Sequence, residues 1–424
     1  MSVALCVLGL GAATAAQALE YGPFSLTGFA KVNLSHVSNG CEGCQRDPTA
    51  VRHFIWADDL VYGKKYGSLS KHGVQIQPTL GVKFDLPQGF TIAGAYSQRW
   101  RDGEPDLPEV YERSLTLKHE YYGTFQIGNF VSRGWNRADT PYASDLGQTA
   151  FSDAGAAYGI LTRAVRYTSR ELYVADGNLV LEASYDQGNT NFKRNKPRLF
   201  EFWALWARGP LVVEAVAQSA RNGTPVAFAK WPFTGLTPFA DRDDPQLGSS
   251  SQGMFMLLSK YQIGTAYEVS GGLRFNRWSG AYAVPLTQGA LAQWSDPFNV
   301  DWGGFDANGV PNPGYPARST DLMLGLRKYI NPKLVGYVGM TYLGKARTAN
   351  PSERGQSNSA LLASIGAEYN FGGGLSVSGA LNAVAYARKG LAPLSMPAHD
   401  AFSNVDSRVA NRGNSVTFEA VYQF

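Results

Sequence analysis

The sequence predicts an all-β fold: a transmembrane antiparallel β-barrel of about sixteen strands, with short periplasmic turns and long extracellular loops. Three observations support this prediction. Apolar and polar residues alternate with a period of two along most of the chain, aromatic residues gather beside the short connections, and the chain ends on the alternating segment 416–424. The final residue, Phe424, is aromatic, which is typical of the closing strand of an outer-membrane barrel. The alternative is the last strand of a soluble β-sandwich.

The N-terminal residues 1–18 have the pattern of a signal peptide. An apolar run at 3–16 precedes the small residues Ala16 and Ala18, and it is too short and too rich in Gly and Ala to span a bilayer as a helix. The basic residues that usually precede such a run are missing, and Cys6 lies inside it. We therefore predict an exported protein whose barrel is formed by residues 19–424.

The segment 74–86 shows the strand pattern most clearly. Apolar residues occupy its even positions and polar residues most of its odd ones, a period that excludes an amphipathic helix. Within it, Pro78 removes a backbone donor and predicts a local bulge or kink. The turn 87–89 follows and leads into 90–99 in the same phase, which predicts a hairpin.

The same unit recurs along the chain, with short and long connections in alternation; only 188–220 and 253–262 alternate poorly. The predicted strands are 25–37, 74–86, 90–99, 111–121, 124–131, 162–169, 178–187, 198–208, 211–220, 253–262, 266–277, 318–329, 334–344, 359–371, 375–387 and 415–424. Short turns are expected at 87–89, 122–123, 208–210, 262–265, 330–333 and 372–374, and a somewhat longer one at 170–177. Long polar loops are expected at 38–73, 100–110, 132–161, 188–197, 221–252, 278–317, 345–358 and 388–414.

Aromatic residues lie next to the expected short turns rather than at strand centres. Amphipathic rings prefer the interface between lipid and water, so a ring of them at one end would form the periplasmic girdle of a barrel. A β-sandwich would instead hold its aromatic residues at strand centres, inside the core. The residues concerned are Phe84, Phe90, Tyr121, Tyr122, Trp206, Tyr261, Tyr267, Tyr329, Tyr369, Phe371 and Phe424.

Charge and histidine content restrict the possible functions. The net charge of +4 gives no reason to expect a nucleic-acid partner. A hydrolase built on a barrel needs a nucleophile and a base, usually a histidine. Of the five histidines, only His36 and His119 fall in predicted strands, both on the outward face and without an adjacent serine motif. We expect no enzymatic activity and no cofactor.

Two cysteines, Cys41 and Cys44, follow the predicted signal peptide. They are candidates for a disulfide at the tip of the first loop, because export passes through an oxidising compartment. A zinc site with His36 or His53 is the alternative, but the loop has no second Cys/His cluster with metal-ligand spacing. Three aspartates in 278–317 could hold calcium, although a solvated acidic loop is the simpler interpretation. We predict no metal site.

Three places in the chain resemble the Gram-negative general porin family. They are the opening strand Ser25–Leu34, the block Phe125–Asn129 followed by a long loop and Thr162-Arg-Ala-Val-Arg-Tyr-Thr-Ser169, and the terminal Val421-Tyr-Gln-Phe424. The resemblance covers essentially the whole mature chain and implies a sixteen-stranded trimeric diffusion channel. It also implies that residues 132–161 fold inward as the constriction loop.

The resemblance further implies where the protein works and what it meets. We expect a multi-pass protein of the outer membrane of a Gram-negative cell, in contact with its lipid and lipopolysaccharide. Small residues that would allow barrels to pack as a homotrimer occur in the first and last strands: Gly28, Ala30, Gly379, Ala383 and Ala385. The chain departs from the family in its longer loops and in the lack of a dense acidic cluster in the constriction segment, which leaves the ion preference open.

The expected function is passive diffusion of ions and small hydrophilic solutes through a water-filled lumen. Basic residues of the early strands facing the loop aspartates would create a transverse field; the alternative is that these charges are solvated lumen residues away from the narrowest point. The candidate pore-lining residues are Lys31, Lys83, Arg99, Lys118, Arg133, Arg137, Asp139, Asp145, Asp153 and Arg166. Later strands add Glu214, Glu268, Arg274, Arg327, Glu368 and Glu419 on the lumen phase.

Two other functions remain open at this point. The first is a substrate-specific outer-membrane channel for a small organic acid or an oligosaccharide. Aromatic residues on the lumen phase, such as Phe29, Phe130 and Tyr386, would favour it by forming a binding track. The second is a non-conducting structural barrel plugged by its long loops.

Overall fold

Twenty strands are present in the described part of the chain, and sixteen of them are long. The computed structural model describes residues 18–37, 69–101, 109–188, 196–222, 232–233, 251–279, 317–345, 347–348, 359–387 and 412–424. The long strands are β2 (Phe24–Val37), β3 (Leu69–Asp85), β4 (Phe90–Arg101), β5 (Glu109–His119), β6 (Gly123–Val131), β7 (Ile160–Thr168), β9 (Gly177–Asp186), β10 (Arg198–Arg208), β11 (Leu211–Arg221), β13 (Ser251–Ile263), β14 (Tyr267–Ser279), β15 (Ala317–Asn331), β16 (Leu334–Leu343), β18 (Ala360–Gly372), β19 (Leu375–Tyr386) and β20 (Arg412–Gln423).

The remaining elements are short. Four strands have two or three residues: β1 (Leu19–Tyr21), β8 (Leu172–Val174), β12 (Pro232–Phe233) and β17 (Arg347–Thr348). The helical turns are η2 (Pro87–Gly89), α2 (Arg133–Arg137), η3 (Ala138–Ala143), η4 (Ser144–Leu146) and α3 (Thr149–Asp153). All but η2 belong to the connection between β6 and β7.

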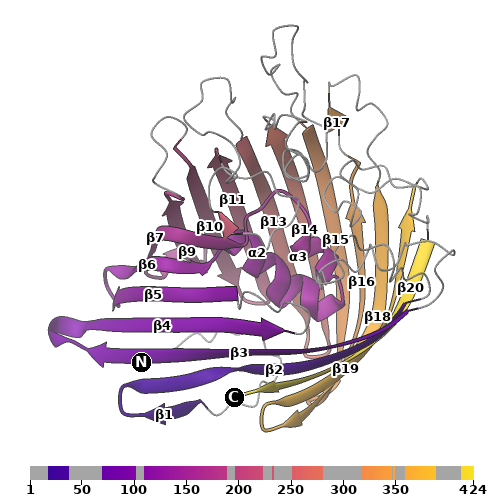
Figure 1. Cartoon of the computed structure of the whole chain (residues 1–424), viewed down its shortest axis with the longest axis horizontal. Coiled ribbons are helices and arrows are strands. Elements are labelled where there is room, and N and C mark those ends of the chain that lie inside the picture. Colours follow the sequence, from indigo (N-terminus) through magenta and orange to yellow (C-terminus); the bar gives the residue numbers. More distant parts are fainter. Residues whose placement is uncertain are drawn as a thin grey trace, which may run out of the picture.

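The sixteen long strands form one closed ring. Each pairs antiparallel with the next long strand, and β2 pairs with β20. At this seam the amides of Gly28 and Phe424 each donate to the carbonyl of the other, at 2.8 and 3.0 Å. Figure 1 shows the strands curving around a central space, with the two ends of the ring meeting beside β2 and β20. The predicted antiparallel barrel of sixteen strands is confirmed.

Every predicted strand is present, and 198–208 has the predicted bounds. The largest difference is at β3, which begins five residues earlier than expected, at Leu69. The connection 170–177 also differs: the strand pairing resumes as β8, and only Ala175 and Asp176 form the turn. Both have positive φ, 51° and 58°. Two such residues make the tight hairpin turn whose twist matches that of the strands.

Pro78 interrupts the strand ladder, but the predicted bulge is absent. The pairing of β3 with β4 stops at Ile76 and resumes at Thr79, without a change of register. On its other side Pro78 lies opposite Gly28, where a Cβ would come within 2.8 Å of the proline Cα. Glycine is needed at this position because any side chain would collide with the backbone of β3.

The two faces of the barrel wall differ in polarity. On β2, for example, Val32 and Leu34 point outward and are exposed, whereas Lys31 points inward and pairs with Glu419. Seven of the eleven aromatic residues beside the short turns are exposed as well, among them Tyr122 and Phe371, and the other four are half-buried. A wall that is apolar outside and polar inside fits a lipid surrounding. Among the described residues, no helix is long and apolar enough to cross a membrane.

Candidate channel constriction

Residues 132–159, here called the inner segment, connect β6 to β7 inside the barrel. The helix α2 begins after Ser132, whose hydroxyl accepts the Trp135 amide at 3.2 Å and donates to the Tyr158 carbonyl at 2.6 Å, so that one side chain holds both ends of the segment together. From α2 to α3 the segment packs against β10, β11, β14, β15, β16 and β18. Figure 1 shows α2 and α3 on the concave side of these strands.

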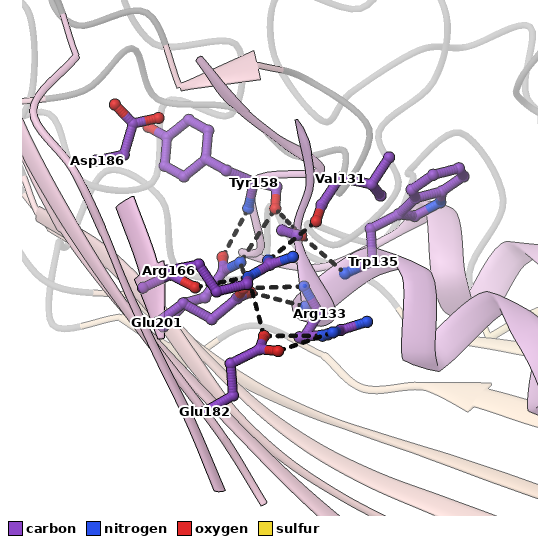
Figure 2. Close-up of polar contacts among 12 residues, drawn as sticks. Val131, Arg133, Trp135, Tyr158, Arg166, Glu182, Asp186 and Glu201 are labelled. Carbon is purple, nitrogen blue, oxygen red and sulfur yellow. Dashed lines mark hydrogen bonds and ion pairs between the residues drawn. The ribbon is translucent and has the colours of Figure 1, made fainter. Parts of the chain in front are cut away.

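The first anchor joins the start of the inner segment to β9 and β10. The Arg133 guanidinium donates to both carboxylate oxygens of Glu182, at 2.8 and 2.7 Å. The Glu201 carboxylate accepts the backbone amides of Arg133 and Gly134, both at 2.9 Å. Arg166 lies between the two carboxylates, 3.0 Å from Glu182 and 3.3 Å from Glu201 (Figure 2). Two arginines and two glutamates therefore neutralise one another in a buried site.

The second anchor joins α2 to β11. Arg137 donates to both oxygens of Glu214, each at 2.6 Å, and the Trp203 indole donates to the same carboxylate at 2.8 Å. The guanidiniums of Arg133 and Arg137 lie over the Trp203 ring, 4.8 and 5.9 Å from its centroid. Bidentate pairs of this kind fix orientation as well as position. Glu214 is fully buried, whereas the Arg137 side chain keeps 23% of its surface exposed.

The third anchor holds α3 against β14 and β15. Arg274 and Asp321 are fully buried and pair at 2.7 Å, and Arg274 also donates to the Phe151 carbonyl of the inner segment. Asn276 completes this anchor: it donates to Asp321 at 2.7 Å and accepts the Ala156 amide at 2.9 Å. The wall thus satisfies backbone groups of the segment that water would otherwise bind.

The fourth anchor lies at η4, the turn nearest β15, β16 and β18. Arg327 donates to Asp145 at 3.0 Å. Leu146 sits over Gly325 and Gly339, where a Cβ on Gly339 would come within 2.6 Å of the Leu146 carbonyl oxygen. The Ser364 hydroxyl binds that same carbonyl and accepts the Gln148 amide. Two glycines and a serine on the wall therefore form a socket for one leucine.

Asp145, in η4 of the inner segment, has a raised pKa. Burial raises its pKa to about 6; the Arg327 charge opposes this effect, and the charges of Glu368 and Glu268 add to it. The Asp145 side chain is still 26% exposed, so its charge can act on the lumen.

Beneath the anchors, the contact between segment and wall is apolar. Tyr142, Leu146 and Phe151 of the segment are fully buried. The inward side chains that contribute to the same cluster from the wall are Trp203, Leu205, Val216, Met254, Met256, Leu258 and Met323. This explains why 188–220 and 253–262 alternate poorly in the sequence: these strands meet lipid outside and the dry underside of the inner segment inside.

The barrel interior consequently has two kinds of wall. The covered wall comprises the inward faces of β9, β10, β11, β13, β14, β15 and β16. The open wall comprises those of β2, β3, β19 and β20 with the turn-side halves of β4 and β5. Side chains of Glu182, Glu214 and Arg274 on the covered wall are at most 1% exposed, whereas Lys31 and Lys83 on the open wall are 32% and 66% exposed.

The structure distributes the predicted pore residues over both walls. On the open side, Lys31 lies 2.5 Å from Glu419 and Lys83 lies 3.8 Å from Asp85, while Lys118 is exposed on the inward face of β5. Arg99 is buried with its guanidinium 4.2 Å above the Tyr111 ring, beside Trp135. On the covered side, Arg133, Arg137 and Arg166 form the ion pairs of the first and second anchors with glutamates of the wall.

The three predicted loop aspartates have local or covered-wall partners. Asp139 accepts the hydroxyls of Ser144 and Ser152, at 2.6 and 3.0 Å. Asp153 is buried and accepts the Trp135 indole at 3.3 Å. Asp145 pairs with Arg327. None of the described ion pairs joins these aspartates to Lys31, Lys83 or Lys118.

Several predictions fall outside the described residues: 1–17 of the signal peptide, and Cys41 and Cys44. In the part of the chain that the structure describes, no three His, Cys, Asp or Glu side chains meet as metal ligands would. His119 has both ring nitrogens engaged: Nδ1 accepts the amides of Tyr121 and Tyr122, and Nε2 lies 3.0 Å from the Gln88 carbonyl.

Sequence reasoning missed four anchor residues on the wall: Glu182, Glu201, Asn276 and Asp321. Each lies on the polar phase of its strand, so the alternation contained a signal for them. Phe130, considered for an aromatic track, is instead buried against Tyr158 and the Arg166 guanidinium.

No family model and no curated protein matches the chain. Solved structures do. The chain superposes on an anion-selective porin from Comamonas acidovorans with a TM-score of 0.59 and 12% identity, covering 95% of this chain and 99% of that one. The chain has the fold of a bacterial porin. Outer-membrane expressed OmpT of Vibrio cholerae gives a TM-score of 0.57 at 12% identity, covering 96% and 100%. The trimer form of in-vitro folded OmpT gives 0.58 at 13%, covering 95% and 99%.

These likenesses concern the fold, because all three identities are low. The superposition extends over nearly the whole of each chain.

Proposed function

We propose that the chain forms a water-filled outer-membrane channel for passive diffusion of ions and small hydrophilic solutes. The observation that carries this proposal is the contrast between the two walls. The inner segment covers one side of the lumen, and on the other side the charged side chains of Lys31, Lys83 and Asp85 stay exposed inside a closed barrel. Charged groups with that exposure need water around them.

In this proposal the constriction lies between the inner segment and the open wall. The segment is held by four anchors and presents Thr140 and Ser144, both exposed, on its free side. Asp139 is half-buried beside them. A solute would pass these groups on one side and the lysines of β2, β3 and β5 on the other, so a transverse field would orient dipolar solutes at this level.

We expect the ion preference of this channel to be modest. Lys31 and Lys83 each lie beside a carboxylate on the open wall, and the arginines of the inner segment are neutralised by their anchors. Lys118 adds one exposed positive charge. The solved porin from Comamonas acidovorans is described as anion-selective, and the exposed positive charge of Lys118 would favour anions here.

Site-directed labelling of the lumen tests the proposal. In a background with Cys41 and Cys44 replaced by serine, Lys31→Cys and Thr140→Cys place thiols on the open wall and on the free side of the inner segment. A bulky thiol reagent should then lower the single-channel conductance in planar bilayers. Val32→Cys, one residue away but facing lipid, is the matched control and should conduct normally after labelling.

Two results would contradict the proposal. One is the absence of conductance from correctly folded protein, which would favour a plugged structural barrel. The other is a conductance that saturates with salt and is blocked by one organic acid or oligosaccharide, which would favour a substrate-specific channel. A conductance proportional to bulk salt supports general diffusion.

We also propose that the barrel assembles as a homotrimer. The support is the small outward-facing residues Gly28 and Ala30 on β2 with Gly379, Ala383 and Ala385 on β19, close to the seam, and the trimer form of the Vibrio cholerae relative. Small residues let backbones approach closely. Native mass spectrometry of protein extracted in mild detergent should give a mass of three chains, and a single-chain mass would contradict this.

A further inference from the structure

The two-residue strand β12 takes over the edge of β7 at the point where β9 ends. β9 pairs with β7 as far as Asp186, and beyond it Pro232 and Phe233 of β12 pair in parallel with residues 160–161 of β7. The Thr162 hydroxyl donates to the Phe233 carbonyl at 2.8 Å, and the Thr162 amide donates to Asp186 at 2.5 Å. One residue of β7 therefore binds both the end of β9 and β12, which belongs to the connection between β11 and β13.

The Phe233 side chain is fully buried in the barrel interior. Its ring meets the Tyr158 ring edge to face, with the ring centroids 5.0 Å apart. It also lies over Gly188, where a Cβ would come within 3.0 Å of the Phe233 ring. The other members of this apolar cluster are Phe130, Leu161, Ala164, Leu199 and Ala220. A buried aromatic side chain of this kind makes many contacts, and all of them are lost when it is removed.

The two ends of the inner segment meet at Ser132 and Tyr158, here called the junction. The Tyr158 carbonyl accepts the Ser132 hydroxyl at 2.6 Å and the Gln218 side-chain amide at 3.1 Å, and the Tyr158 amide donates to the Gln218 side chain at 2.8 Å (Figure 2). Gln218 also donates to Glu201 at 2.6 Å, and that carboxylate accepts the first two amides of α2. A continuous set of contacts thus leads from Phe233 through the junction to the first anchor.

We propose that Phe233 is a positioning residue for the constriction: β12 holds the Phe233 ring against Tyr158 and thereby fixes the junction. The four anchors join the inner segment to long strands of the wall. Phe233 differs from them because it comes from the connection between β11 and β13, so this connection would help to set the position of the inner segment. The proposal concerns where the inner segment lies and does not require that the barrel conducts; only the conductance measurement below rests on the proposed function.

The junction depends on Phe233 through packing. Replacement of this phenylalanine by alanine would leave a cavity beside Tyr158, and side chains that border such a cavity shift toward it. A shift of Tyr158 moves Ser132, to which it is hydrogen-bonded, and with it the start of α2. The free side of the inner segment, at Thr140, would then move relative to the open wall.

The test measures the mobility of the inner segment with a nitroxide spin label in lipid vesicles. In a background with Cys41 and Cys44 replaced by serine, the label is attached at Thr140→Cys. The positioning variant adds Phe233→Ala. The control variant adds Phe200→Ala, which truncates an exposed phenylalanine on the outward face of β10. Electron paramagnetic resonance reports the mobility of the label, and heat-modifiable migration reports whether each variant is folded.

We expect Phe233→Ala to increase the mobility of the label at Thr140 about twofold or more, and Phe200→Ala to leave it unchanged. Thr162→Val, which removes only the hydroxyl bonded to the Phe233 carbonyl, should have a smaller effect in the same direction. A label at Lys31→Cys on the open wall should be as mobile in the positioning variant as in the parent protein. If Phe233→Ala does not fold, Phe233→Leu takes its place and should give a smaller increase at Thr140.

Two results would overturn the proposal. One is equal mobility of the Thr140 label in the parent protein and in the positioning variant. The other is an equal increase at Thr140 and at Lys31, which would show that the whole barrel has loosened. Single-channel recording separates this test from that of the channel. In a conducting barrel, Phe233→Ala should make the current fluctuate more often, whereas a barrel that does not conduct but shows the increase at Thr140 contradicts the proposed channel and supports the role of Phe233.

Discussion

The covered and open walls of this barrel belong to one sheet, but they carry their charges in opposite ways. On the covered wall, Arg274 and Asp321 are fully buried and satisfy one another and the inner segment. On the open wall, Lys31 and Glu419 form a pair of similar chemistry, yet their side chains remain 32% and 26% exposed. Arg274 and Asp321 have lost their contact with water, so each charge depends on the other for stabilisation. Lys31 and Glu419 can still be hydrated if their ion pair is broken.

The difference shows that position relative to the inner segment, not residue type, decides what a lumen charge does. A buried charge holds the segment in place, and removing its partner leaves it without solvation. An exposed charge contributes little to stability, and in the proposed channel it would set the field that a passing ion meets. The four predictions below separate stability from conduction on these grounds.

The largest effect is expected from Asp321→Ala. This substitution leaves the Arg274 guanidinium buried without its counter-charge, and it removes the acceptor of Asn276 and of the Gly344 amide. We expect a loss of about 3–5 kcal/mol in the free energy of unfolding. The measurement is denaturant unfolding in lipid vesicles, followed by tryptophan fluorescence. The matched substitution on the open wall, Glu419→Gln, should cost at most about 1 kcal/mol; equal losses would remove the distinction between the walls.

A smaller effect is expected from Gly339→Ala, which fills the socket of Leu146. The new Cβ would press on the Leu146 carbonyl, a backbone atom that cannot turn away, so the inner segment must shift. We expect a destabilisation of about 1–3 kcal/mol together with an altered single-channel conductance. Gly336→Ala on the same strand is the control, because its nearest side-chain neighbour is Ile330 at 3.7 Å. A normal conductance from Gly339→Ala would mean that the segment does not bound the pore.

Acidification should move the ion preference toward anions. Because the pKa of Asp145 is raised to about 6, its carboxylate is mostly charged at pH 7 and mostly neutral at pH 5, so the site gains one positive charge as the pH falls. Arg327 is then less well neutralised, with Glu268 and Glu368 as the remaining nearby carboxylates. A single charge near the water path is worth about 1 kcal/mol at most, so the permeability ratio should change up to about fivefold. Reversal potentials in a salt gradient measure it.

The variant Asp145→Asn gives the control for this pH effect. It should show at pH 7 the ion preference that the parent protein shows at pH 5, and it should not change further on acidification. If the variant keeps the full pH dependence, then another titratable group causes it, and the Asp145 carboxylate does not affect the ion preference.

The smallest effect is expected from Lys118→Gln on the open wall. Removal of one exposed charge should leave the free energy of unfolding unchanged within about 0.5 kcal/mol and should lower the preference for anions, most clearly at low salt where screening is weak. Lys260→Gln is the reverse case, since Lys260 is nearly buried and lies 3.7 Å from Glu268 on the covered wall. It should lower stability and leave the ion preference unchanged.

Much of this fold could be predicted from the sequence. A strand with an apolar environment on one face and a polar environment on the other alternates apolar and polar residues, and this alternation is visible in the sequence. The sixteen strands, the short turns and the inward phase of Glu214, Arg274 and Arg327 follow from that pattern alone. The strand predicted at 253–262 is present, and its alternation is weak for a physical reason: Met254, Met256 and Leu258 face the apolar side of the inner segment. Weak alternation between clear strands was itself the sign that something covers the wall.

The contacts of the constriction could not be derived in the same way. Alternation tells which face a glutamate occupies but not which arginine it meets. Arg133 and Glu182 are 49 positions apart, and several other carboxylates share the same face. The socket of Leu146 combines β15, β16 and β18, and its defining feature is the absence of side chains at Gly325 and Gly339. Only the closed geometry brings these positions together.

The location of the four anchors has a consequence for biogenesis. Glu182, Glu201, Glu214, Arg274 and Arg327 all lie later in the chain than the inner segment that they hold. During synthesis and export, the segment emerges before its docking partners exist, and its buried arginines must stay hydrated until β9 to β15 have paired. We therefore expect the inner segment to dock, and the barrel interior to narrow, only after β9 to β15 have paired.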